Sequence, residues 1–108
     1  MRKIATRLPF GGLKVSKPVN TAYPYVTGIE QVGQTLTAGN GSWSGNPTSY
    51  TYQWFNSSTG SIHGQTSSTY VAKVGDLGCY VTVKVIATNA AGSTTSSSWN
   101  MSQISAAG

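Results

Sequence analysis

The chain has 108 residues, of which 38% are hydrophobic and 8% are charged, and its length suits a single domain with one modest core. Its abundant Ser and Thr hydroxyls and its few charges fit a β domain at an extracellular or particle surface better than a cytosolic enzyme. The net charge of +5 is unevenly placed, and no apolar run approaches the roughly 18 residues of a membrane helix, which argues against insertion into a membrane.

Residues 1–17 form a basic segment without any acidic residue. Apolar side chains stand between the positive ones, and Pro9 with Gly11 and Gly12 prevents a continuous helix. We expect residues 1–23 to be an extended arm with its linker, which docks on a partner through apolar anchors and is steered there by charge. The alternative is a solvated tail, which has no need of the apolar residues. The residues predicted to bind the partner are Arg2, Lys3, Arg7, Leu8, Phe10, Leu13, Lys14 and Lys17.

The arm is not expected to be a signal peptide. Arg2 and Lys3 suit the start of one, but Arg7 and Lys14 interrupt the apolar stretch that export requires, and no small-residue cleavage site follows. We therefore expect the arm to be retained in the mature protein. From Pro18 onward the positive and negative side chains balance, so the chain combines a basic anchor with a neutral domain.

Residues 24–108 show short runs of β-forming residues separated by Gly, Asn, Pro and Ser clusters, which predicts strands joined by turns. No segment has the periodicity of a helix. We expect an all-β domain, an antiparallel β-sandwich of about seven strands. The expected strands are 25–29, 34–38, 50–55 after a polar loop, a short one near Ile62, 69–72, 79–88 and a polar edge strand at 93–99.

The longest expected strand, 79–88, indicates where the core lies. Val81, Val83 and Val85 alternate with mostly polar residues, so their face is expected to be the buried one. In the strand before it, Trp54 is predicted to be the central aromatic of the core, packed on Val83 or Val85. These four residues define the predicted core.

Two stretches of the domain, VGQTLTAGNGSWSGNPTSYTYQW and SSTYVAKVGDLGCYVTVKVIATNAAGS, resemble the immunoglobulin-like repeat of bacterial surface proteins and tailed-phage virion proteins. The resemblance covers about residues 24–98 and implies an immunoglobulin-like sandwich. Such sandwiches are reused as spacers, adhesins and decorations, so the fold alone does not decide the function. The matching parts are Val32 with Gly33, Trp43 in a Gly/Ser loop, Tyr52 with Gln53 and Trp54, the corner at Asp76 and Gly78, and the turn at 87–92.

The chain departs from antibody-type domains at two points. Cys79 is the only cysteine, so a disulfide between the sheets is absent. The corner that reads Asp-x-Gly-x-Tyr-x-Cys in those domains reads Asp76, Gly78, Tyr80 and Thr82 here. Because Tyr80 alternates with the expected buried valines, we predict that it points outward rather than forming a buried tyrosine corner.

Residues suited to catalysis or metal binding are scarce. Glu30 and Asp76 are the only acidic residues, and Asp76 is expected to cap a turn through backbone amides. His63 and Cys79 occur once each, without the spacing of a zinc site, and no G-x-S-x-G sequence is present. We expect no enzyme activity, no metal and no cofactor.

Aromatic residues in or beside polar loops are candidates for contact with glycans. They are Trp43, Tyr50 and Trp99. The alternative is that these rings cover the ends of the sandwich.

Together with the resemblance, these patterns predict a non-enzymatic structural protein of a tailed-phage virion. We expect it to decorate the capsid, with the arm bound to the major capsid protein or to other virion subunits. The domain would face outward and hold cell-surface glycans weakly and multivalently. Its expected location is the surface of the particle, and a homo-oligomer is left open.

Three alternatives stay open. A tail or baseplate component would differ only in its partner. A nucleic-acid-binding protein would use the five basic groups of the arm on phosphates, and its affinity would fall with a log–log salt slope of about −3.5 to −4.5. The neutral sandwich offers no basic groove beside the arm, which disfavours this reading. A carbohydrate-binding module would bind glycans without the arm.

Overall fold

The computed structural model describes residues 16–100 and 102–107. Over these residues the chain contains strands and one 3-10 turn, η2 (Val74–Asp76), and no α-helix. The predicted all-β class with antiparallel sheets is therefore confirmed. The strands are β1 (Val19–Ala22), β2 (Tyr25–Thr27), β3 (Thr35–Gly39), β4 (Ser42–Ser44), β5 (Ser49–Asn56), β6 (Gly60–Ser61), β7 (Thr69–Val71), β8 (Tyr80–Asn89), β9 (Gly92–Ser97) and β10 (Ser102–Gln103).

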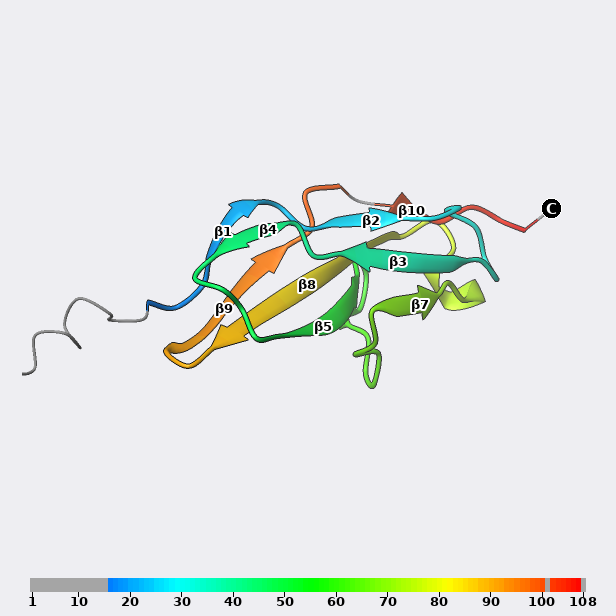
Figure 1. The fold of residues 1–108 in the computed structure, drawn as a ribbon. Helices are drawn as coiled ribbons and strands as arrows, with labels where there is room; N and C mark the ends of the chain where they lie inside the picture. Colours follow the sequence, from blue (N-terminus) through cyan, green and yellow to red (C-terminus); the bar gives the residue numbers. More distant parts are fainter. Residues whose placement is uncertain (1–15, 101, 108) are drawn as a thin grey trace, which may run out of the picture.

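The larger sheet is built around β8, its longest strand (Figure 1). β5 pairs antiparallel with one edge of β8 over the whole length of β5. β9 and β10 share the other edge, β9 along residues 84–89 and β10 along residues 80–81. β6 pairs with the last two residues of β5 at the outer edge of the sheet. β8 is thus the central strand of this sheet, as the sequence predicts.

A second sheet has the order β2-β3-β7, and β1 with β4 forms a separate two-stranded ladder. These strands lie over one face of the larger sheet (Figure 1). The core fills the space between the layers, because buried residues of β2, β3 and β7 pack in one cluster with those of β5 and β8. The arrangement is a β-sandwich.

The valines of β8 and the tryptophan of β5 form the centre of the core. Val81, Val83 and Val85 are fully buried, as expected for one face of an alternating strand. Trp54 is also fully buried and lies opposite Val83 in the β5–β8 ladder. Its ring stacks on Tyr70 of the other sheet, with the ring centroids 5.6 Å apart. The four residues predicted for the core all lie in the buried cluster.

The N-terminal part of the described chain is attached to the sandwich. β1, in the segment expected to be a linker, pairs antiparallel with β4. Pro18 is fully buried, and its carbonyl oxygen accepts a hydrogen bond from the Thr94 hydroxyl at 2.6 Å. Ser96 of β9 likewise donates to the Asn20 side-chain oxygen at 3.0 Å. β1 therefore lies between β4 and the edge of β9.

Three short strands, β1, β4 and β10, were not expected from the sequence. They have two to four residues each, too few to show a periodic pattern, and they are defined by the partner strands that hold them in register. The strand expected at 25–29 ends at Thr27. Gly28 takes a φ of +121°, and a Cβ there would meet the Thr35 carbonyl oxygen at 2.5 Å, so the chain turns at this glycine.

Candidate functional site

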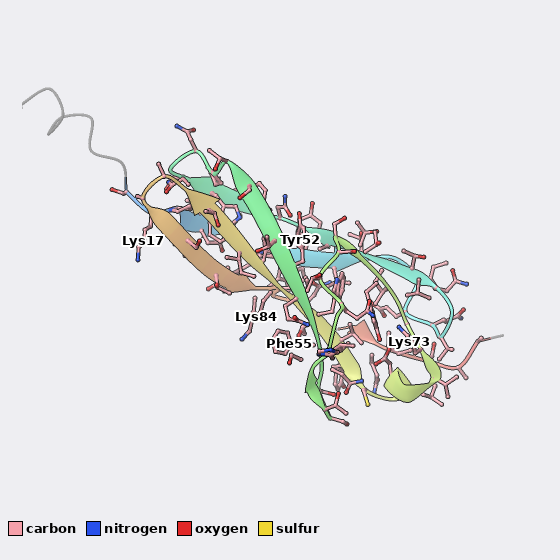
Figure 2. All side chains as sticks on the ribbon, turned by 90° about the horizontal axis from the view of Figure 1, so that it is seen from below. Lys17, Tyr52, Phe55, Lys73 and Lys84 are labelled. Carbon is pink, nitrogen blue, oxygen red and sulfur yellow. The ribbon has the colours of Figure 1, made fainter. Side chains whose placement is uncertain are left out.

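Lys17 is the one predicted arm residue that the structure describes. Its side chain is exposed at the end of the sandwich where the arm enters (Figure 2). The aliphatic stem lies over Gly92, where a Cβ would stand 2.8 Å from the Lys17 Cε. The stem thus rests on the β8–β9 turn while the ammonium group reaches solvent. The other predicted arm residues, Arg2, Lys3, Arg7, Leu8, Phe10, Leu13 and Lys14, lie outside the described residues.

A buried asparagine fixes the point where the arm joins the sandwich. The Asn89 side-chain nitrogen donates to the carbonyl oxygens of Ser16 and Gly45, both at 2.8 Å. Its side-chain oxygen accepts from the Ala91 N–H at 2.8 Å. Asn89 therefore joins the β8–β9 turn, the loop after β4 and the start of the described chain. From sequence it was read only as part of a turn.

The two ends of the described chain lie at opposite poles of the sandwich (Figure 1). Residue 16 lies beside the β8–β9 turn, at what we call the arm pole. Residues 104–107 lie at the far pole, with η2 and the β2–β3 turn. Hydrogen bonds join these far-pole segments, from the Val32 N–H to the Ser105 carbonyl and from the Gly78 N–H to the Ile104 carbonyl.

Charge is sparse on the described sandwich. Two of its lysines are placed over aromatic rings, Lys73 with its Nζ 5.0 Å from the Tyr70 centroid and Lys84 with its Nζ 4.6 Å from the Phe55 centroid (Figure 2). They come from different layers and do not form a basic groove. The charged side chains of the described residues are Lys17, Lys73, Lys84, Glu30 and Asp76.

Asp76 is the centre of a buried polar network. One of its carboxylate oxygens accepts from the Asn56 side-chain nitrogen at 2.7 Å. The other accepts from the Tyr70 hydroxyl, and from the Lys73 N–H at 2.9 Å. The predicted cap on a backbone amide is therefore present. Asp76 also joins β5 and β7 to η2, which the sequence does not indicate.

The network fixes the charge states of its members. Burial alone would raise the pKa of Asp76, but the hydrogen bonds from Tyr70, the Lys73 amide and Asn56 outweigh burial and hold this pKa below its ordinary value. Burial, and then the hydrogen bond and the negative charge of Asp76, raise the pKa of Tyr70 well above its usual value. Around neutral pH, Asp76 is a carboxylate that accepts and Tyr70 a neutral phenol that donates.

The three aromatic residues predicted to contact glycans lie in different environments. Trp43 and Tyr50 are half-buried and pack against the core. The Trp43 indole N–H donates to the Asn40 carbonyl at 2.7 Å, so the polar atom of this ring is already bonded within the domain. Trp99 is 68% exposed. Of the three, Trp99 offers the most surface to a ligand.

Two further exposed aromatic residues, Tyr23 and Tyr25, lie on the segment to which Trp99 is hydrogen-bonded. The Trp99 N–H donates to the carbonyl oxygen of Pro24, the residue between the two tyrosines, at 3.0 Å. In the sequence, Tyr23 lies in the expected linker and Tyr25 at the start of the first expected strand, so neither stands out as a candidate. The available signal was the Tyr-Pro-Tyr sequence itself, in which a proline between two strands separates two large rings.

Among residues 16–100 and 102–107, no three His, Cys, Asp or Glu side chains come together as a metal site would require. The same residues contain no helix that is long and apolar enough to cross a membrane. No family model, no curated protein and no solved structure matches the chain.

Proposed function

We propose that this chain is a non-enzymatic structural protein of a tailed-phage virion that decorates the capsid and displays an immunoglobulin-like domain. The observation that carries the proposal is the separation of charge from the sandwich. Four positive side chains precede residue 16, whereas the described residues carry three lysines against two acidic residues. The basic segment joins the sandwich at one pole, so a partner bound there leaves the other pole facing outward (Figure 1).

Strand order supports an immunoglobulin-like sandwich. Such a domain places strands A, B and E in one sheet and strands C, F and G in the other. If β2, β3 and β7 are taken as A, B and E, and β5, β8 and β9 as C, F and G, the observed sheet orders follow this scheme. The buried Trp54 then lies on strand C, where these domains carry their core tryptophan. Tyr80, 41% exposed, points outward as predicted, and no tyrosine corner forms at that residue.

The proposed partner is the major capsid protein or another virion subunit. Arg2, Lys3, Arg7 and Lys14 would pair with acidic patches, and Leu8, Phe10 and Leu13 would fill apolar pockets. Lys17 contributes from the arm pole, where its stem is already held against Gly92. Apolar anchors make such a complex far less sensitive to salt than a complex with nucleic acid, which rests on charge alone.

Co-sedimentation with purified tailed-phage capsids that lack their decoration protein tests the proposal. The full chain is compared with a chain that lacks residues 1–15, at low and at high salt. The cut is placed before Ser16 because Ser16 and Pro18 are bonded to the sandwich. A triple variant, Leu8→Ser, Phe10→Ser and Leu13→Ser, removes the apolar anchors but keeps every charge. It therefore separates the contribution of the apolar side chains from that of the basic ones.

We expect the full chain to bind capsids at both salt concentrations, and both the truncated chain and the triple variant to stay in the supernatant. Binding of the truncated chain equal to that of the full chain would reject the anchor. Binding to isolated tails in place of capsids would move the protein to the tail or baseplate. Loss of binding at high salt, with retention by the triple variant, would favour a charged partner such as nucleic acid.

A further inference from the structure

Three exposed aromatic residues lie on two segments that are distant in sequence and are joined by a backbone hydrogen bond. Tyr23 is 66% exposed, Tyr25 is 42% exposed and Trp99 is 68% exposed. The hydrogen bond from the Trp99 N–H to the Pro24 carbonyl places the backbone of Trp99 next to the residue between the two tyrosines. Single exposed aromatic residues are common on protein surfaces and need no explanation. A contiguous group of exposed apolar residues is more often a surface that contacts a ligand or a partner. We call these three residues the aromatic cluster.

Two glycines lie against the segment that carries the tyrosines. Tyr25 lies opposite Gly39 in the β2–β3 ladder, and its ring covers the place where a Gly39 side chain would stand. A side chain at Gly41 would collide with the backbone between Ala22 and Pro24. The Tyr-Pro-Tyr segment therefore lies against a Gly-Asn-Gly segment. Because Gly39 has no side chain, the Tyr25 ring lies over this residue of β3.

The segment that carries Trp99 is fixed by the residue after it. The Asn100 side-chain oxygen accepts from the Val26 N–H, and its nitrogen donates to the Val26 carbonyl, both at 2.9 Å. This side chain thus bonds the edge of β2 as a neighbouring strand would. The backbone on both sides of the cluster is therefore anchored, so a ligand would not have to order it.

The segments that carry and support the cluster are uncharged. Residues 18–29 and 92–100, which carry the cluster, contain no Lys, Arg, Asp or Glu, and neither does the segment 31–72 that includes the supporting glycines. Hydroxyl and carboxamide groups take the place of charge on β1, β4 and β9. This chemistry favours a neutral ligand with apolar faces and many hydroxyl groups over an anionic lipid, a nucleic acid or a charged peptide.

We propose that the aromatic cluster is a binding site for neutral glycans, in which the C–H faces of pyranose rings stack on Tyr25 and Trp99 while the sugar hydroxyls meet neighbouring amide and hydroxyl groups. The site lies within residues 16–100, so the assignment goes beyond the proposed anchoring function and does not depend on which partner holds the arm. Of the three residues that the sequence predicts to contact glycans, the proposed site keeps Trp99. The exposed Tyr23 and Tyr25 take the place of Trp43 and Tyr50, which are half-buried.

Titration of the ¹⁵N-labelled full chain with neutral hexasaccharides of glucose (maltohexaose and cellohexaose) and of N-acetylglucosamine (chitohexaose) tests the proposal by NMR. The indole N–H signals of the three tryptophans provide an internal comparison, because those of Trp43 and Trp54 donate within the protein to Asn40 and Ser67. With at least one sugar we expect shifts of the Trp99 indole and of the amides near Tyr25 and Gly39. The Trp43 and Trp54 indoles should stay unchanged.

Variants then assign the binding to the cluster. Trp99→Ala and Tyr25→Ala should each weaken binding at least tenfold, and Val74→Ala, which trims a 75% exposed side chain at the far pole, should leave it unchanged. No shift with any of the three sugars, or equal affinity in Trp99→Ala, would overturn the proposal. So would self-association through these residues without sugar, because a second copy would then occupy the cluster. Capsid binding by Trp99→Ala is measured in parallel, so that the anchor and the glycan site fail or succeed separately.

Discussion

At the scale of single residues, the Asp76 network shows how a charge is kept inside a domain with few charged residues. A buried carboxylate without partners would be costly, but the donors from Asn56, Tyr70 and Lys73 satisfy both of its oxygens. Tyr70 has two roles, since its hydroxyl donates to Asp76 and its ring stacks on Trp54. The network therefore connects the turn at η2 to the centre of the core.

The hydroxyl of Tyr70 can be removed without changing the shape of its ring. We expect Tyr70→Phe to lower the free energy of unfolding by about 1.5–3 kcal/mol, because it removes a hydrogen bond to a charged group inside the protein. Tyr80→Phe, at an exposed ring, is the matched control and should change it by less than about 0.5 kcal/mol. Urea denaturation at neutral pH measures both. Equal stability of the two variants would show that the network does not stabilise the fold.

The same network predicts how stability depends on pH. Because the pKa of Asp76 is lower in the folded protein, its contribution is present above the ordinary carboxyl pKa of about 4 and is lost as pH falls further. The pKa of Tyr70 is raised on folding, so its contribution is present below about pH 10 and is lost as pH rises beyond that value.

We therefore expect the free energy of unfolding to be nearly constant from about pH 5 to pH 9 and to fall on both sides. Denaturation curves collected across this range provide the test. Asp76→Asn, which is less stable at neutral pH, should lose most of the acid dependence. A strong decline between pH 5 and pH 8 would contradict this account, because neither group titrates there.

At the scale of the elements, the edges of the sandwich are closed in two different ways. The Asn100 side chain covers Val26 at the edge of β2, and β1 lies along β9 through the hydroxyls of Thr94 and Ser96. Unpaired strand edges invite pairing with other chains, so these side chains act against aggregation as well as for stability.

Asn100→Ala isolates this effect. We expect it to lower the free energy of unfolding by about 1–3 kcal/mol, because two backbone groups of Val26 lose their partner. We also expect it to increase self-association, measured by sedimentation velocity. Asn100→Asp keeps the acceptor but loses the donor, and it should not restore stability. The control is Ser97→Ala, at the exposed last residue of β9. A comparable loss of stability in that variant would mean that the hydrogen bonds of Asn100 are not the cause.

The elements that could be predicted from the sequence are those whose pattern is local. Alternation over ten residues identifies β8 and its buried valines, and Trp54 is the tryptophan of the expected strand before it. β1, β4 and β10 are too short to carry a pattern, and their formation depends on partners distant in sequence. For the candidate site, exposure of Trp99 follows from its polar surroundings. The contribution of Tyr23 and Tyr25 depends on the hydrogen bond between Trp99 and Pro24, which no local pattern encodes.

At the scale of the whole molecule, the boundary between the arm and the sandwich lies within the first two dozen residues. The sequence suggests a boundary after residue 23, whereas Ser16, Pro18 and β1 already bond to the sandwich. A chain that lacks residues 1–15 should keep its stability to within about 0.5 kcal/mol. A chain that lacks residues 1–23 should lose more than about 2 kcal/mol, because the burial of Pro18 and the β1–β4 ladder are removed. Thermal unfolding of both chains decides this, and equal melting temperatures would place the boundary after β1.

The position of β1 also determines how the domain responds to mechanical force. A pull on the arm against a load at the far pole acts along the long direction of the sandwich, and β1 is the first strand to receive it (Figure 1). β1 runs antiparallel to β4 and is bonded to β9 on its other side, so the force slides strands past one another and strains several hydrogen bonds at once. Bonds strained together in shear resist more force than bonds opened one after another. We therefore expect the domain to resist unfolding when it is pulled by its N-terminal end.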